Sequence, residues 1–529
     1  MSHNAWLRPP SIGPSRWGGP CTTDGCDLPA VVVRRDGPHC AACQYIGQAE
    51  DPHEEEALSR LYPYQLEGVR WLRRSRAALL ADDMGLGKTP QALLAASTIG
   101  WSAPIVVVCP ASLRLQWQRA ATETWRTHLP GDVRVQVRRQ KTPAPTAGQI
   151  LIVGYPWLRQ AELPIEPERG TLVIYDEAQA LKNPQSAQTR GARRLSDAAL
   201  AVGGGVWLLT ATPARANGSE LWHVLRAAGL EQAIARHPDR AQEDPYGVAS
   251  RLPRVCLRRT PEDCGVDLPS VVRDYLPVSL PSVSAGEVDA AAREALSATE
   301  LSRIGKSAYS VARAAGRSVA ESQVAAAEAA ESARAESVAR VAMLDSAEAA
   351  AELEEILAGD GGEPGALSRM RAALAKAKLP VALALAEAAI DSGSPEVILS
   401  AHRALGEEFR RRGWPTVIGG QSPATRAAEV ARFVSGSEPV IGGTLACCAE
   451  GVDGLQRVSR VLTLVDRDWT PAVTGQAIGR LVRLGQGSGS VLIRLLVADH
   501  WVDHVVEACC GSKRHMLEAL GLGLGEAWI

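Results

Sequence analysis

The sequence predicts an α/β protein with two lobes, each built on a parallel sheet, and a helical segment between them. Three observations predict this fold class. Apolar runs at residues 77–81 and 171–175 are each followed by a polar motif. Further apolar runs lie at residues 397–400, 439–441 and 461–465, and an alanine-rich stretch separates the two sets. Strands of a parallel sheet are buried on both faces and form continuous apolar runs, whereas alanine and glutamate favour helices.

A glycine-rich loop is the most informative element of the first lobe. It reads Ala81-Asp-Asp-Met-Gly-Leu-Gly-Lys-Thr89. Gly85 and Gly87 let the backbone turn tightly, so that successive N–H groups and a helix N-terminus can face phosphates. Lys88 can place its charge on the β- and γ-phosphates, and Thr89 can offer its hydroxyl to Mg²⁺. The residues expected to bind the nucleotide are Asp83, Met84, Gly85, Leu86, Gly87, Lys88 and Thr89.

The flanks of the loop fit a strand that enters it and a helix that leaves it. Residues 77–81 form the short apolar run, and residues 91–96 are rich in helix-forming alanine and leucine. One position departs from the generic phosphate-loop pattern, which has glycine where this chain has Asp82. Alone, such a loop indicates only that a phosphate can bind, so the other motifs decide its meaning.

An Asp-Glu pair follows the second apolar run. The run Thr171–Tyr175 delivers Asp176 and Glu177 to the carboxyl end of a predicted central strand. Asp176 can hold Mg²⁺ through its water shell, and Glu177 can orient or deprotonate the attacking water. The alternative is an ordinary surface pair after a strand. The position of the pair between the phosphate loop and Thr210-Ala-Thr212 favours the catalytic interpretation.

A further motif, Gln476–Gln486, lies near the far end of the chain. Arg480 and Arg483 are three residues apart, so a helix would place them on one face, from which they can act as arginine fingers on the transferring phosphoryl group. A solvated basic face is the alternative, and the flanking Gln476 and Gly485-Gln486 argue against it. The ordered motifs predict that two lobes share one ATP. The catalytic residues are expected to be Lys88, Asp176, Glu177, Gln476, Arg480 and Arg483.

In this order the motifs resemble those of the Swi/Snf-type ATPases of helicase superfamily two, and within them the compact HARP-like annealing-helicase branch. The resemblance covers roughly residues 58–280 and 376–515. Two positions depart from the family pattern: Gln179 stands where histidine is usual, and Ala211 where glycine is usual. They bear on DNA coupling more than on ATP hydrolysis. Further family-like segments are Leu61–Leu72, Ala180–Pro184, Arg258–Asp263 followed by Asp267–Pro269, Ser400–Arg403 and Ala449–Leu455.

The resemblance implies both a fold and an activity. It implies tandem RecA-like helicase lobes at residues 58–280 and 376–529, a helical insertion at 286–375, and Gln65 as the adenine contact. The implied activity is ATP-driven movement on duplex DNA that remodels or reanneals DNA or protein–DNA complexes. Duplex or forked DNA is the expected partner rather than single strands. A strand-separating helicase and a nucleotide-gated DNA-binding scaffold are the alternative functions.

Four cysteines near the amino terminus have the spacing of a metal site. They are Cys21, Cys26, Cys40 and Cys43, and the strand of the hairpin between the two pairs would be Val31–Arg35. Two paired-cysteine turns at this separation can place four thiolates tetrahedrally around Zn²⁺, so residues 1–50 resemble a zinc ribbon. Four unrelated thiols are the alternative interpretation. Because a ribbon of this size has little core, the metal would supply most of its folding energy.

The segment between the lobes has a different composition. Residues 286–357 are rich in alanine with regular glutamate and arginine, and their sparse large apolar residues predict only a thin buried stripe. Long helices that protrude from the lobes are expected, and disorder over part of the segment is the alternative. The glycine-rich residues 359–365 end this region, and residues 375–380 are expected to begin the second lobe.

Overall composition fits a multidomain enzyme with no membrane span. The chain has 529 residues, of which 46% are hydrophobic, and no apolar stretch approaches the roughly 20 residues that a span needs. Eleven cysteines without a signal-peptide pattern suggest a reducing compartment, so a cytoplasmic location is expected. The net charge of −2 gives no global basic footprint for nucleic acid, and each local arginine cluster fits a solvated helix face better than a DNA site.

Overall fold

The computed structural model describes residues 32–34, 37–39, 61–100, 103–128, 134–137, 145–160, 165–214, 217–358, 364–449, 452–468, 471–483 and 485–522. Backbone contacts divide the chain into two compact units. Unit 1 comprises Met1–Leu268 and His515–Gly525, and unit 2 comprises Pro269–Arg514 and Glu526–Ile529.

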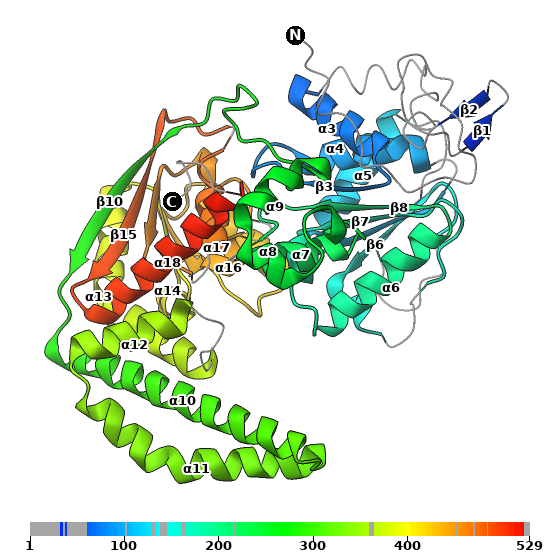
Figure 1. Cartoon of the computed structure of the whole chain (residues 1–529). Coiled ribbons are helices and arrows are strands. Elements are labelled where there is room, and N and C mark those ends of the chain that lie inside the picture. The colour runs from blue at the N-terminus through cyan, green and yellow to red at the C-terminus, as the bar shows by residue number, and fades with distance from the viewer. Residues whose placement is uncertain are drawn as a thin grey trace. The chain divides into compact units, whose positions relative to one another are not determined.

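Unit 1 is built on a seven-stranded sheet with the order β5-β6-β4-β7-β8-β3-β9, in which all neighbours are parallel (Figure 1). The apolar runs expected as strands at 77–81 and 171–175 are β3 and β7, so both predictions are confirmed. The strands are β3 (Ala77–Leu80), β4 (Ile105–Cys109), β5 (Arg134–Val137), β6 (Gln149–Gly154), β7 (Leu172–Asp176), β8 (Gly205–Leu209) and β9 (Cys256–Leu257).

Helices cover both faces of this sheet, and successive strand residues enter different cores because side chains alternate across a strand. Leu79 packs in the core beneath α6 and α7, whereas Leu80 packs in the core beneath α3, α4 and α5. Burial on both faces explains why the strands are continuously apolar. The helices are α3 (Pro63–Arg74), α4 (Lys88–Gly100), α5 (Arg114–His128), α6 (Ala187–Ala201), α7 (Gly218–Arg226), α8 (Pro238–Glu243) and α9 (Pro245–Arg251).

Unit 2 contains a second parallel sheet, with the order β10-β15-β14-β11-β13-β12. The apolar runs expected at 397–400, 439–441 and 461–465 fall in β11, β13 and β14, which confirms these strands. The strands are β10 (Ser270–Val278), β11 (Glu396–Ser400), β12 (Thr416–Val417), β13 (Val440–Thr444), β14 (Val461–Leu464) and β15 (Ser490–Ala498).

The boundary expected for the first lobe, residues 58–280, is corrected by the pairing of β10. This strand hydrogen-bonds to β15 along its whole length, so unit 1 ends at Leu268 and the segment that follows belongs to unit 2. The last residues of the chain also differ from the expected lobe at 376–529, because His515–Gly525 group with unit 1. Sheet membership is set by non-local pairing, which local sequence patterns do not encode.

The alanine-rich segment of unit 2 is helical. It forms α10 (Ser282–Ala314), α11 (Val319–Met343) and α12 (Ser346–Ala358), and α10 and α11 lie side by side as a long hairpin (Figure 1). Residues 375–380, expected to begin the second lobe, lie inside α13. The other helices of unit 2 are α13 (Pro364–Ser392), α14 (Ala404–Arg411), α15 (Pro423–Val434), α16 (Leu445–Ala449), α17 (Pro471–Ile478) and α18 (Trp501–Ala519).

Two short strands lie near the amino terminus. β1 (Val32–Arg34) pairs antiparallel with β2 (Gly37–His39), in agreement with a hairpin strand at Val31–Arg35. The four cysteines expected to bind Zn²⁺ lie outside the described residues, so the ribbon stays a prediction. They are Cys21, Cys26, Cys40 and Cys43. Within the described ranges, no helix is both long and apolar enough to cross a membrane.

Candidate nucleotide-binding site

The phosphate loop joins the carboxyl end of β3 to α4 in unit 1. Gly85 and Gly87 have φ values of 85° and 75°, which favour glycine, and α4 begins at Lys88. A Cβ atom at Gly87 would lie 2.4 Å from Nε2 of Gln65, so this glycine is also required by close packing. The loop therefore has the tight turn and the following helix N-terminus that bind phosphate groups.

The ammonium of Lys88 is held by the loop itself. Its Nζ donates to the carbonyl oxygen of Asp82 at 2.7 Å and to that of Asp83 at 3.3 Å. Burial lowers the pKa of Lys88, and the nearby carboxylate of Glu177 acts in the opposite direction. A phosphate oxygen would offer this cation a negative charge in place of neutral carbonyl oxygens. The lysine is thus positioned for the phosphate contact that the sequence predicts.

The acidic pair lies at the carboxyl end of β7. Asp176 is buried and accepts hydrogen bonds from Nε1 of Trp117 at 2.6 Å and from the Glu177 N–H at 3.1 Å. Burial and the neighbouring carboxylate of Glu177 raise the pKa of Asp176 to about 7. A buried carboxylate whose pKa is raised in this way is suited to bind a cation, which would stabilise its charged form. The oxygens of Thr89 and Asp176 are suitable donors for Mg²⁺.

Glu177 has an unusual backbone conformation. Its φ of 53° and ψ of 51° are left-handed, which is uncommon for a residue with a side chain and costs about 1–3 kcal/mol. Tyr155 supports this turn, because its hydroxyl donates to the carbonyl oxygens of Asp176 at 2.8 Å and Glu177 at 3.3 Å. Backbone strain of this kind is concentrated at functional sites.

A hydrogen-bond chain runs from Glu177 to the end of β8. Nε2 of Gln179 donates to the Glu177 carboxylate at 2.7 Å, and its Oε1 accepts from the Thr210 hydroxyl at 2.6 Å. The Thr212 N–H then donates to the Thr210 hydroxyl oxygen at 2.9 Å. Gln179, which departs from the family pattern, thus provides both a donor and an acceptor in one side chain. The acidic pair and the Thr-Ala-Thr motif are physically connected.

Asp82, the other departure, is explained by an arginine near the end of unit 1. The guanidinium of Arg259 makes two hydrogen bonds to the Asp82 carboxylate, at 2.9 and 2.6 Å, and Gln91 donates to the same carboxylate at 3.1 Å. Both charged side chains are buried. Arg258 forms a second ion pair, 2.9 Å from Asp83. We call Asp82, Asp83, Arg258 and Arg259 the loop clamp, which no local sequence pattern indicates.

Gln65 lies against the phosphate loop. Its Nε2 donates to the carbonyl oxygen of Leu86 at 3.2 Å, and its Oε1 accepts from the Tyr62 N–H at 3.1 Å. These contacts fix helix α3 to the loop. The adenine contact assigned to Gln65 stays a prediction, whereas its position beside Gly87 is a feature of the fold.

The motif residues of unit 2 differ from the expected arrangement. Helix α17 carries Gln476, which is buried, but the helix ends at Ile478. Arg480 and Arg483 therefore lie in the turns after the helix, and the prediction that they share a helix face is wrong. Gly479 follows the last helical residue, and glycine is a poor helix former.

Both arginines have partners within unit 2. Arg480 donates to the carbonyl oxygen of Ala449, and Nη1 of Arg483 lies 2.9 Å from Oδ1 of Asp453. Asp453 belongs to the family-like segment at Ala449–Leu455, so the two segments are neighbours in space. A role as fingers on the phosphoryl group stays a prediction for these arginines.

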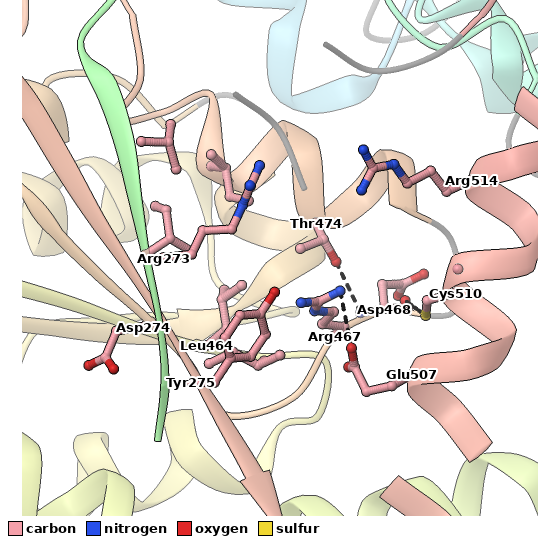
Figure 2. Close-up of a pocket in the computed structure, with 15 residues that line it drawn as sticks. Arg273, Asp274, Tyr275, Leu464, Arg467, Asp468, Thr474, Glu507, Cys510 and Arg514 are labelled. Carbon is pink, nitrogen blue, oxygen red and sulfur yellow. Dashed lines mark hydrogen bonds and ion pairs between the residues drawn. The ribbon is translucent and has the colours of Figure 1, made fainter. Parts of the chain in front are cut away.

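A cavity of about 240 Å³ lies beside these segments in unit 2 (Figure 2). Its polar lining includes Arg467, whose Nη1 lies 3.2 Å from Oε2 of Glu507. It also includes Thr474, whose hydroxyl accepts a hydrogen bond from the Asp468 N–H at 3.2 Å. None of the residues expected to bind ATP lines it. Its apolar floor comes from β10, β14, β15 and α17, through Val271, Leu464, Ile478, Ile493 and Leu495.

Comparison with known proteins places these motifs in a family context. Residues 64–282 match the family model of the SNF2-related domain. The chain is similar to the "SWI/SNF-related matrix-associated actin-dependent regulator of chromatin subfamily A-like protein 1 homolog" of Caenorhabditis elegans, with 31% identity over 250 residues. This match covers 43% of the chain and 35% of that protein. The chain is also similar to the "DNA annealing helicase and endonuclease ZRANB3" of Bos taurus, with 27% identity over 266 residues. This match covers 45% of the chain and 24% of that protein.

Among solved structures, the chain is similar to the "Sulfolobus solfataricus SWI2/SNF2 ATPase core in complex with dsDNA", with 20% identity and a TM-score of 0.34 over 83% of this chain and 88% of that one. The chain spans about a third or less of the length of the two curated relatives named above. The family match contains the phosphate loop, the acidic pair and the loop clamp. Residues 64–282, most of which belong to unit 1, are thus similar to an SNF2-related domain.

Proposed function

We propose that this protein is a DNA-dependent ATPase that couples ATP hydrolysis to movement along duplex DNA. The observation that carries the proposal is the gathering of a phosphate loop, a buried acidic pair and a connected Thr-Ala-Thr motif at the carboxyl ends of β3, β7 and β8, within an SNF2-related domain. Ligands bind at this edge of open α/β sheets. Remodelling or reannealing of DNA, as in HARP-like enzymes, is the finer form of this proposal.

In the proposed reaction, unit 1 binds the triphosphate and prepares the attacking water. Loop N–H groups and Lys88 bind the phosphates, and Glu177 orients the water and accepts its proton. Thr89 and Asp176 would hold Mg²⁺, which neutralises phosphate charge. Gln179 holds the Glu177 carboxylate through one hydrogen bond, and a second hydrogen bond connects Gln179 to Thr210 at the end of β8.

Unit 2 would complete the active site with Gln476, Arg480 and Arg483. Fingers of this kind stabilise charge on the transferring phosphoryl group. This requires Arg480 and Arg483 to exchange their partners, the Ala449 carbonyl and the Asp453 carboxylate, for phosphate oxygens. Such an exchange would couple the nucleotide state to the segment at 449–455.

An ATPase assay with matched DNA substrates tests the proposal. Turnover is measured with duplex, forked and single-stranded DNA of equal length, beside a strand-displacement assay on the same forked substrate. A translocase on duplex DNA is stimulated most by duplex or forked DNA and displaces no strand. Strand displacement would support a helicase instead, and DNA binding gated by nucleotide without turnover would support a scaffold.

We also propose that residues 1–50 form a zinc ribbon. Elemental analysis of protein purified without added metal should find one Zn²⁺ per chain. Cys40→Ser should lose the ion, because a closed tetrahedral site needs all four thiolates, while basal ATPase activity is retained by the separate cores of the two units. A metal-free wild-type protein, or a Cys40→Ser protein with its full zinc content, would contradict the ribbon.

A further inference from the structure

The hairpin of α10 and α11 has an anchored base and a simple distal arm. At the base, Val288 and Leu296 of α10 and Val341 of α11 enter a core shared with α12, α13 and α18. Beyond this core, the two helices pack on each other through small residues. Gly305 faces the backbone of Ala326, and Ala312 is buried. We define the arm as residues 301–330.

The α10 side of the arm is strongly basic. Residues 301–318 contain four basic side chains and no Asp or Glu. The residues of α11, 319–343, contain four glutamates and two arginines. The basic side chains are exposed, and they are Arg303, Lys306, Arg313 and Arg317. The positive charge is therefore concentrated in residues 301–318, whereas residues 282–300 at the base of α10 contain four acidic residues and one arginine.

Helix geometry gathers three of these cations into a line. At about 100° per residue, Arg303, Lys306 and Arg313 fall within a sector about 80° wide, and they extend over about 15 Å of the helix axis. The buried residues Gly305 and Ala312 lie on the side of α10 that faces α11, so the line of cations is not used in packing between the two helices. Within the line, Arg313 also donates to the carbonyl oxygen of Arg317. We call this line the basic stripe.

We propose that the basic stripe binds the phosphate backbone of DNA, as a contact additional to those of the two sheets. The stripe is positive, exposed and straight, and duplex DNA presents one negative charge per about 1.7 Å of its axis. Ser310 lies within the same sector and Ser307 beside it, and serine hydroxyls are common donors to phosphate oxygens. This proposal rests on DNA being the partner in the proposed function.

The side chains of the stripe favour nucleic acid over an acidic protein. Protein–protein hot spots are rich in tryptophan, tyrosine and arginine packed in desolvated pockets. The sector of the stripe contains no aromatic or large apolar side chain, and the residues that flank it are Ser302, Ser307, Ala314 and a single aromatic residue, Tyr309. A surface of cations and hydroxyls without an apolar centre matches a backbone contact that carries no sequence information.

Binding of a fluorescent duplex to the full-length protein at several salt concentrations tests the proposal. The variant Arg303→Gln/Lys306→Gln/Arg313→Gln removes the stripe. Each lost phosphate contact lowers the slope of log K against log salt by about 0.9, so the variant should bind more weakly with a slope smaller in magnitude by about 2.7. The charge-preserving variant Arg303→Lys/Lys306→Arg/Arg313→Lys should keep the wild-type slope.

A single-residue pair controls for the loss of net charge. Arg303→Gln should reduce the magnitude of the slope by about 0.9, the value for one phosphate contact. Arg334→Gln, on α11, where Arg334 pairs with Glu331 at 2.9 Å, should leave the slope unchanged. Equal slopes for the wild type and the triple variant, with normal folding by circular dichroism, would overturn the proposal, and an acidic partner protein would then be the better candidate. If duplex DNA does not bind or stimulate the wild type at all, the proposed function itself fails.

Discussion

The phosphate loop of unit 1 and the arginine motif of unit 2 differ in how firmly their charged groups are held. In the loop clamp, Arg259 and Asp82 are both buried and joined by two hydrogen bonds. In the motif, Arg483 pairs with Asp453, whose side chain is 63% exposed. Exposed pairs contribute about 0–1 kcal/mol, whereas a buried pair is costly to break. The loop is therefore fixed when unit 1 folds, and the arginine of the motif can change partners.

The largest effects are expected at Glu177 and Lys88, the reacting groups of unit 1. Glu177→Gln should bind ATP but lower turnover by about 100- to 10,000-fold, because a positioned proton acceptor is removed. Lys88→Ala should abolish productive nucleotide use. Single-turnover hydrolysis and nucleotide binding separate the two effects. Substantial turnover by Glu177→Gln would refute its role.

The arginine motif should give a nearly pure loss of activity. Arg480→Ala and Arg483→Ala are each expected to lower turnover by about 1,000-fold if these side chains act as fingers. The melting temperature should remain nearly unchanged, since Arg483 is held by an exposed ion pair. Parallel losses of stability and activity would make the arginines structural and remove the contrast between the two regions.

The loop clamp should show the opposite behaviour. Arg259→Leu leaves the buried Asp82 carboxylate without its cation and should destabilise unit 1 by about 3–5 kcal/mol. The double variant Arg259→Leu/Asp82→Leu removes both charges and should recover most of that stability. Denaturant unfolding monitored by tryptophan fluorescence measures both. A single variant as stable as the wild type would show that the clamp is dispensable.

The smallest effect concerns pH. Burial raises the pKa of Asp176 to about 7 from its ordinary value of 3.8, so its contribution to stability is full below pH 4 and is lost as the pH rises through 7. In EDTA, the melting temperature of the wild type should fall between pH 5 and 8 more than that of Asp176→Asn. Each kcal/mol of unfolding free energy lost corresponds to a fall of about 2–4 °C. Added Mg²⁺ should reduce the difference. Parallel curves for the two proteins would contradict the assignment.

Local patterns predicted the parts of the fold that local chemistry determines. The phosphate loop, β7 and the helices of the alanine-rich segment follow from glycine positions, apolar runs and helix propensity. The loop clamp joins residues 177 positions apart, and the Trp117 contact to Asp176 spans 59 positions. Such pairings depend on the folded topology, so no motif at one position indicates them. The helix expected to carry Arg480 and Arg483 ends earlier, at Ile478, because Gly479 is a poor helix former.

One consequence of the topology concerns the way the hairpin is attached. The segment from α10 to α13 leaves after β10 and returns before β11, and both strands belong to the same sheet. Its tip, at Gly316, is a short exposed turn between two helices. Such turns accept inserted sequence with little cost to the fold. A fluorescent reporter domain grafted at Gly316 would therefore leave both sheets intact, and would let movement along a DNA track be followed on single molecules.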